Sequence, residues 1–124
     1  MEVVKHEEGF EKLETTPNIS RKVVHLKDLM FTVIEFSNGP MNEPEPPHNH
    51  SHEQISYVAA GKLKLFIEDR EYLLSEGDVF KVESNLNHSI QTLTEFVKLI
   101  DGFSPIREDF LQSSHYKNKN TTIP

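Results

Sequence analysis

Apolar and polar residues alternate in short runs through most of the chain, and this period of two is typical of half-buried β-strands. Leu63, Leu65 and Ile67 alternate with Lys64, Phe66 and Glu68. The runs are rich in β-branched and aromatic residues and are separated by Gly, Pro, Asn and Asp, as in strands joined by turns. The predicted strands cover residues 21–26, 29–36, 54–60, 63–68, 71–74, 79–82, 88–93 and 95–103.

Short strands at spacings of about 8–12 residues predict a β-sandwich or barrel. The 124 residues are enough for one domain, with a core over about residues 21–111. We find no long stretch of helical periodicity and no internal repeat.

The segments between and beyond the strands carry other signals. Residues 15–18 predict a turn. Residues 41–47 contain three prolines, which have no N–H to give to a sheet, so they predict a stiff extended loop that ends at His48. Residues 107–115 predict a short helix, and the polar residues 116–124 predict a flexible tail.

Charge and cysteine content limit the partners. The net charge of −7 disfavours nucleic acid as a partner. No cysteine is present, so a disulfide framework and a thiolate metal site are both excluded. The chain shows no stretch of about 20 apolar residues and no apolar N-terminal segment. We therefore expect a cytoplasmic protein that binds neither nucleic acid nor membranes.

The most informative stretch runs from Pro46 to Gln54 and contains three histidines in five residues. On an alternating segment His48, His50 and Gln54 lie on one face, and imidazole nitrogens at this spacing suit a divalent transition metal. The alternative is a polar loop that binds nothing, since the chain has seven histidines in all. His88, which opens a strand after a turn, is the candidate for a fourth ligand; taken alone, it would be a surface or capping histidine.

These residues resemble the two sequence motifs of the cupin family. Gly39, His48, His50, Gln54 and Gly61 follow the first motif, with Gln in place of the usual Glu. Gly77 and His88 follow the second, in which Glu83, Asn85 and Thr92 stand where the motif has Pro, Gly and Asn. The resemblance implies an all-β double-stranded β-helix, or jelly roll, with a divalent metal on His48, His50, Gln54 and His88. It also implies a homodimer in which N-terminal strands pair onto the partner.

The ligand at position 54 affects the chemistry of the site. Glu53 would face away on a strand, so Gln54 is the expected ligand. Four neutral ligands leave the full charge of a nickel, zinc, iron, manganese or cobalt ion in place for Lewis-acid chemistry. The carboxylate of the facial triad of non-haem iron oxygenases is missing. His52 lies on the same face of the alternating segment as His48 and His50, and it either orients a ligand, contacts the substrate or faces solvent.

A narrower resemblance points to the pectin-degradation cupins. It rests on Arg21–Val23, on Pro47–Val58 and on Phe103–Leu111. That family converts 4,5-unsaturated monouronates into linear keto sugars, so the resemblance implies a metal-dependent isomerase acting on a small anionic sugar.

Three residues near the end of the last predicted strand fit such a role. Asp101 shares a face with apolar residues and is either a solvated rim residue, a partner of Arg107 or a proton-transfer group. Arg107 offers a planar fork for a carboxylate, or else pairs with a neighbouring acid. With the resemblance, we expect Asp101 to move a proton, Arg107 to bind the sugar carboxylate and Phe103 to pack on the ring.

Two other functions remain open at this stage. One is a metal-dependent dioxygenase acting on a small organic substrate. The other is a sugar- or metabolite-binding cupin without catalysis, because this fold hosts many functions.

Overall fold

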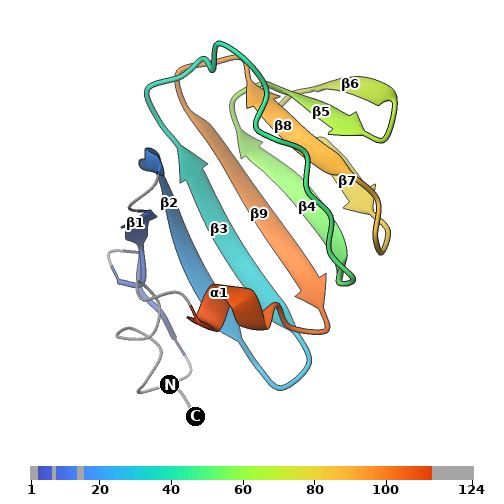
Figure 1. The fold of residues 1–124 in the computed structure, drawn as a ribbon. Helices are drawn as coiled ribbons and strands as arrows, with labels where there is room; N and C mark the ends of the chain where they lie inside the picture. The colour runs from blue at the N-terminus through green and yellow to red at the C-terminus, as the bar shows by residue number, and fades with distance from the viewer. Residues whose placement is uncertain (1–2, 7, 14–15, 113–124) are drawn as a thin grey trace.

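The chain forms two antiparallel β-sheets that face each other and a short helix at one end (Figure 1). This computed structural model describes residues 3–6, 8–13 and 16–112. The larger sheet has the strand order β1-β2-β3-β9-β4-β7 and the smaller sheet β6-β5-β8. The elements are β1 (Glu11–Leu13), β2 (Thr16–His25), β3 (Met30–Phe36), β4 (Glu53–Ala60), β5 (Leu63–Ile67), β6 (Arg70–Leu74), β7 (Val79–Val82), β8 (His88–Thr92), β9 (Val97–Ser104) and α1 (Glu108–Gln112).

Apolar side chains from both sheets fill the space between them, as in a jelly roll. The main cluster joins residues of the larger sheet, such as Ile34, Val58 and Leu99, to Leu63, Leu65 and Ile90 of the smaller sheet. The predicted double-stranded β-helix is therefore confirmed, and so are its predicted strands, except that β2 begins five residues earlier than predicted and β1 was not predicted.

The proline-containing loop before His48 is extended, as predicted, and runs along β8. Its backbone bonds to β8 at three points: Met41 to Thr92, Glu45 to Ile90, and His48 to His88 in both directions. The loop thus covers the free edge of β8 and delivers His48 beside His88.

The two ends of the chain differ from the predictions. The prediction of a turn over residues 15–18 is wrong for Thr16 to Asn18, because these residues begin β2. Thr15 lies outside the described residues. Pro17 is accepted because its missing N–H costs least near the start of a strand. The predicted helix is present over Glu108–Gln112; residues 113–115 and the predicted tail 116–124 lie outside the described residues.

The short helix closes one end of the barrel. Phe110 and Leu111 of α1, with Ile106, pack on the buried side chains of Val23, Met30 and Phe103. Figure 1 shows α1 lying across the inner side of the larger sheet near the ends of β2, β3 and β9. Within the described part of the chain, no helix has the length and apolar character that a membrane crossing requires.

The alternation of side chains is inverted at this end of the larger sheet. In most half-exposed sheets the apolar residues face inward and the polar ones outward. Here β3, β9 and β4 turn polar residues into the barrel, namely Thr32, Asp101, Gln54 and Ser56, all at most 8% exposed. Their apolar neighbours Phe31, Ile55 and Tyr57 face out and are 45–59% exposed. Such polar groups inside a barrel require partners, and these partners form the candidate site.

Candidate metal centre and acidic pocket

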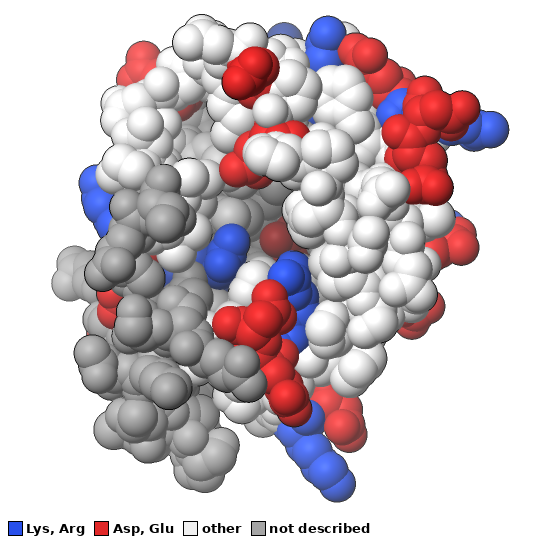
Figure 2. All heavy atoms as spheres, viewed as in Figure 1, with Lys and Arg blue, Asp and Glu red and all other residues white. Residues whose placement is uncertain are grey.

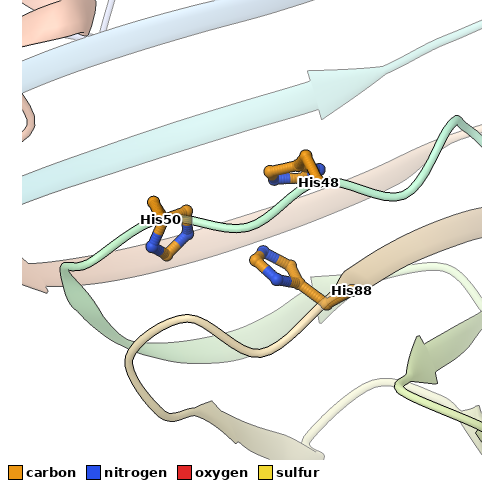
Figure 3. Close-up of side chains that lie close together, drawn as sticks. All are labelled: His48, His50 and His88. Atoms are coloured by element: carbon orange, nitrogen blue, oxygen red, sulfur yellow. The ribbon is translucent and has the colours of Figure 1, made fainter.

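Three histidines converge at the mouth of the barrel (Figure 3). His48 and His50 come from the segment before β4, and His88 is the first residue of β8. The candidate ligand atoms of the three rings all lie within 4.8 Å of one another. Paired backbone bonds of 3.0 and 2.9 Å between His48 and His88 fix the two segments side by side.

Backbone carbonyls orient two of the rings. Nδ1 of His50 lies 2.9 Å from the His52 carbonyl, and Nδ1 of His88 lies 2.9 Å from the Leu86 carbonyl. A carbonyl only accepts hydrogen bonds, so Nδ1 carries the proton in each ring. The Nε2 atoms then keep their lone pairs, which is how neutral histidines are arranged around metal ions.

Gln54 adds an oxygen to this group. The Ser56 hydroxyl donates to the Asp101 carboxylate at 2.6 Å and accepts from the Gln54 amide nitrogen at 2.8 Å. This contact turns Gln54 Oε1 toward His50, where it lies 3.2 Å from Nε2. Two atoms that both present lone pairs repel each other at about 3 Å unless a cation lies between them. A separation of about 3 Å is also the distance between adjacent ligand atoms that each lie about 2.1 Å from one metal ion.

The protonation state of the histidines also suits a metal. Loss of hydration lowers the pKa of His48 to about 4, helped by the charges of His88, Arg107 and His50. Loss of hydration likewise lowers the pKa of His50 and of His88. Metal binding requires deprotonated imidazoles, so the rings at neutral pH are ready to act as ligands. The geometry and the donor set therefore fit one divalent ion, and the group could hold such an ion.

Asp101 lies deeper in the barrel, at the centre of a row that crosses three strands. Thr32, Asp101 and Ser56 are direct neighbours in the register of β3, β9 and β4. The carboxylate accepts from Ser56 at 2.6 Å and from Thr32 at 3.3 Å. Burial raises its pKa to about 6, while these hydrogen bonds and the charges of Arg21 and Arg107 oppose the rise. A carboxylate with such a pKa can accept and return a proton near neutral pH.

We expect Asp101→Asn to change how the stability of the metal-free protein depends on pH. The pKa of Asp101 is raised on folding from its ordinary value of 3.8 to about 6, so the protonated form stabilises the fold below pH 3.8. That contribution, about 3 kcal/mol, is lost as the pH rises to about 6. Urea unfolding at several pH values gives the free energy of unfolding of both proteins. The value for the variant, relative to the wild type, should rise by this amount between pH 4 and 7. A difference in free energy of unfolding that does not change with pH would contradict the raised pKa.

Two arginines and two phenylalanines form the wall above Asp101. The guanidinium groups of Arg21 and Arg107 lie 4.2 and 4.0 Å from the centroid of the Phe110 ring. Arg107 also lies 5.5 Å from the ring centroid of Phe103, which packs edge-on against Phe110 at 5.7 Å. Aromatic faces attract cations, so these contacts hold the two guanidinium groups in place.

Arg107 is already paired with an acid. Its Nε and a terminal nitrogen donate to the two carboxylate oxygens of Asp109, at 3.2 and 2.7 Å. The carboxylate of Asp109 is mostly exposed, whereas the side chain of Arg107 is only 13% exposed. The pair shows that the guanidinium of Arg107 can bind a carboxylate through two hydrogen bonds in this part of the structure.

A single pocket joins these groups. Its lining includes the candidate ligands His48, Gln54 and His88, the aromatic residues Phe103 and Phe110, and the charged residues Arg21, Glu45, Asp101 and Arg107. Figure 2 shows a hollow in this face of the molecule, with basic and acidic side chains around its mouth and an acidic one in its depth. The two arginines of the lining offer positive charge for an anion, and a carboxylate lies in the interior.

The sequence predicted most of these residues but not their partners. One pocket is lined by His48, Gln54, His88, Asp101, Phe103 and Arg107, and His50 lies beside it in the histidine cluster. Glu53 is exposed. Thr32, Ser56, Arg21 and Glu45 were missed as members of the site. The inverted alternation of β3 and β4 was the available signal for Thr32 and Ser56. His52 is half-buried, and its Nδ1 has no hydrogen-bond partner among the described residues.

One departure from the second motif has a simple physical explanation. Asn85 has a φ of 67° and occupies the place of the usual glycine. Asparagine is one of the few residues that adopt this conformation readily, so the turn before His88 is kept. The backbone N–H of Asn85 donates to the His50 carbonyl at 2.8 Å, which ties this turn to the histidine segment.

A jelly roll with histidines at its mouth and a pocket behind them is the architecture of a cupin, and the sequence matches the cupin domain family over residues 39–101. The chain belongs to the cupin family. Over 100 residues it is 39% identical to the pectin degradation protein KdgF of Dickeya dadantii (strain 3937), a match that covers 79% of this chain and 88% of that protein.

Two solved structures are also similar. KdgF from Halomonas sp. superposes with a TM-score of 0.76 at 34% identity, covering 87% of this chain and 96% of that one. An RmlC-like cupin from Shewanella frigidimarina NCIMB 400 superposes with a TM-score of 0.72 at 31% identity, covering 89% and 99%. The predicted resemblance to pectin-degradation cupins is thus confirmed.

Proposed function

We propose that the protein is a metal-dependent isomerase that opens the ring of 4,5-unsaturated monouronates to give linear keto sugars. The observation that carries the proposal is a line of contacts from His50 to the buried Asp101. His50 Nε2 lies 3.2 Å from Gln54 Oε1, Gln54 donates to Ser56, and Ser56 donates to Asp101. This line places a candidate metal site and a carboxylate of raised pKa on one pocket that also contains Arg107. The similarity to pectin degradation proteins supports the substrate class.

The reaction needs proton transfer and no oxidant. The anomeric hydroxyl loses its proton, the bond between C1 and the ring oxygen breaks, and C1 becomes an aldehyde. The electron pair passes to the former ring oxygen as an enolate. C4 then takes a proton, the C4–C5 double bond is lost and C5 becomes a ketone. One proton leaves and one returns, so a single carboxylate can serve both transfers.

The residues of the pocket have distinct roles in this proposal. His48, His50, Gln54 and His88 would hold one divalent ion, which would supply a Lewis acid for substrate oxygen atoms. Asp101 moves the proton, and Ser56 and Thr32 fix its orientation and stabilise the carboxylate form. Arg107 pairs with the sugar carboxylate, and Phe103 packs on the sugar ring and on the guanidinium of Arg107.

The test follows the loss of ultraviolet absorbance as the conjugated double bond of an unsaturated monouronate disappears. We expect turnover with metal-loaded protein, loss of turnover after chelation, and recovery when nickel, zinc, iron, manganese or cobalt is added back. Absence of turnover with every metal would overturn the proposal. Parallel measurement of oxygen uptake separates it from the dioxygenase, which would consume oxygen with the substrate.

Arg107→Ala should raise KM for the uronate by about 10- to 100-fold, because a charge-assisted hydrogen bond to a largely buried guanidinium is worth about 1.5–3 kcal/mol. The metal content should stay that of the wild type, since Arg107 is not a candidate ligand. Arg70→Ala is the matched control: Arg70 is an exposed arginine on β6 and does not line the pocket. Unchanged kinetics in Arg107→Ala would contradict the assigned role.

The proposal retains two expectations about the protein in the cell. The first is a cytoplasmic location, which fractionation of the producing cells would test. The second is a homodimer, which sedimentation of the full chain over a range of concentrations would test.

A further inference from the structure

Glu45 puts a second carboxyl group on the wall of the pocket, and the proposed reaction gives it no role. It lies on the extended loop that runs along β8, and its backbone N–H donates to the Ile90 carbonyl at 2.9 Å. Pro44 and Pro46 flank it, so the backbone that carries the side chain is stiff. The residue is half-buried and lines the pocket together with Asp101. A carboxyl group held on a pocket wall by a fixed backbone can select among substrates.

The backbone contacts of the loop place Glu45 away from the clustered histidines. His48 bonds to His88, the first residue of β8, whereas Glu45 bonds to Ile90, two residues further along that strand. Residues of a strand advance by about 3.3 Å each, so these two contacts lie about 7 Å apart along β8. The pocket therefore has a histidine end and a Glu45 end.

One arginine acts on each end of the pocket. Besides loss of hydration, the charge of Arg107 lowers the pKa of all three clustered histidines. At the other end, burial raises the pKa of Glu45, and the charge of Arg21 opposes that rise. The two arginines thus have different surroundings, because Arg21 acts at the end that carries Glu45.

The spacing of the arginines raises the question of which anions the pocket accepts. The guanidinium groups of Arg21 and Arg107 lie 4.2 and 4.0 Å from the centroid of the same Phe110 ring, so about twice that distance separates them at most. Without Glu45, two guanidinium groups this close together would suit both carboxylates of a six-carbon sugar diacid. Glu45 offsets the charge of Arg21 and would repel a carboxylate that approaches it.

A uronate, by contrast, carries one carboxylate, and its other substituents are hydroxyl groups. With the carboxylate on Arg107, the hydroxyls of the opposite ring edge lie toward the Glu45 end. A carboxylate accepts hydrogen bonds from hydroxyls. We infer that Glu45, together with Arg21, is a specificity-determining residue that selects sugar acids with one carboxylate over those with two. This inference rests on the proposed function for the position of the sugar in the pocket.

Glu45→Gln tests the inference in calorimetric titrations of the metal-loaded protein at pH 8 with two unreactive sugar acids. Glucuronate has one carboxylate, and glucarate has two. Loss of the charge at position 45 favours the first carboxylate of both ligands, so this effect cancels in the ratio of their dissociation constants. The ratio should shift toward tighter glucarate binding by about 10-fold or more, because a like charge near the second carboxylate is removed.

Glu43→Gln is the matched control for this substitution. Glu43 is an exposed acid on the same loop and does not line the pocket. Its ratio of dissociation constants should equal that of the wild type. Adding Arg21→Gln to Glu45→Gln should abolish the gain in glucarate binding, because Arg21 supplies the charge that attracts the second carboxylate.

Two outcomes would overturn the selective role of Glu45. One is an unchanged ratio in Glu45→Gln, and the other is an equal shift in Glu43→Gln. The titrations need no turnover, so their result is separate from that of the absorbance assay. Absence of turnover would overturn the proposed function, whereas normal turnover with an unchanged ratio would overturn the inference about Glu45 alone.

Discussion

Asp101→Asn is expected to lower kcat for unsaturated monouronate by about 10²- to 10⁴-fold, the usual range for removal of a general acid or base. Asparagine keeps the size of the side chain and can still bond to Ser56 and Thr32, but it cannot take up a proton at neutral pH. The measurement is the initial rate of absorbance loss with metal-loaded protein. Metal content should equal that of the wild type, because Asp101 reaches the histidines only through Ser56 and Gln54.

Glu76→Gln provides the control for this substitution. Glu76 is an exposed acid in the turn before β7, so the change removes an acid of the same class without touching the pocket. Its kcat should match that of the wild type. Near-wild-type kcat in Asp101→Asn would assign the proton transfer to another group and leave Asp101 as a structural acid.

His88→Ala is expected to weaken metal binding by more than about 100-fold. Loss of a residue that only orients a ligand costs 10- to 100-fold in affinity, and loss of a ligand should cost more. His88 also shares its backbone bonds with His48, and those bonds do not depend on its side chain. Metal content per chain and competition with a chelator give the affinity, and circular dichroism checks that the sheets are retained.

His25→Ala is the matched histidine control. His25 ends β2, its Nδ1 contacts the Leu26 carbonyl, and it is not one of the three clustered histidines. Its variant should bind metal like the wild type. Equal affinity of His88→Ala and the wild type would remove His88 from the metal site and leave the pair His48 and His50 to explain any binding.

The part of the fold that could be predicted is the part that the pattern of neighbouring residues determines. The strands from β3 to β9 follow from alternation and from the turn residues between them, both of which are properties of neighbouring positions. The start of β2 could not be found in this way. Thr16 to Asn18 have no strand pattern and contain a proline, and they are ordered by contacts with distant residues; Ser37, for example, donates to the Asn18 carbonyl.

The same limit applies to the site. His48 and His50 are two residues apart, so their common face could be predicted, and His88 was linked to them by the resemblance to cupins. The partners of Asp101 depend on the register of three strands, Thr32 lying 69 positions away and Ser56 45 positions away. Register is set by the whole sheet, and for that reason the role of these hydroxyls became evident only in the structure.

The inverted alternation of β4 also has a consequence for folding. A slip of one residue in this strand would bring Ile55 and Tyr57 into the barrel and expose Gln54 and Ser56, so the interior would become more apolar at these positions, although the buried Val58 would turn outward. The correct register must therefore be chosen at the ends of the strand. Gly61 does this at one end, with a φ of 84° and a position where a Cβ would lie 2.2 Å from the Phe96 carbonyl oxygen. The polar pocket thus leaves a competing alignment available to the folding chain, and the turn at Gly61 disfavours it.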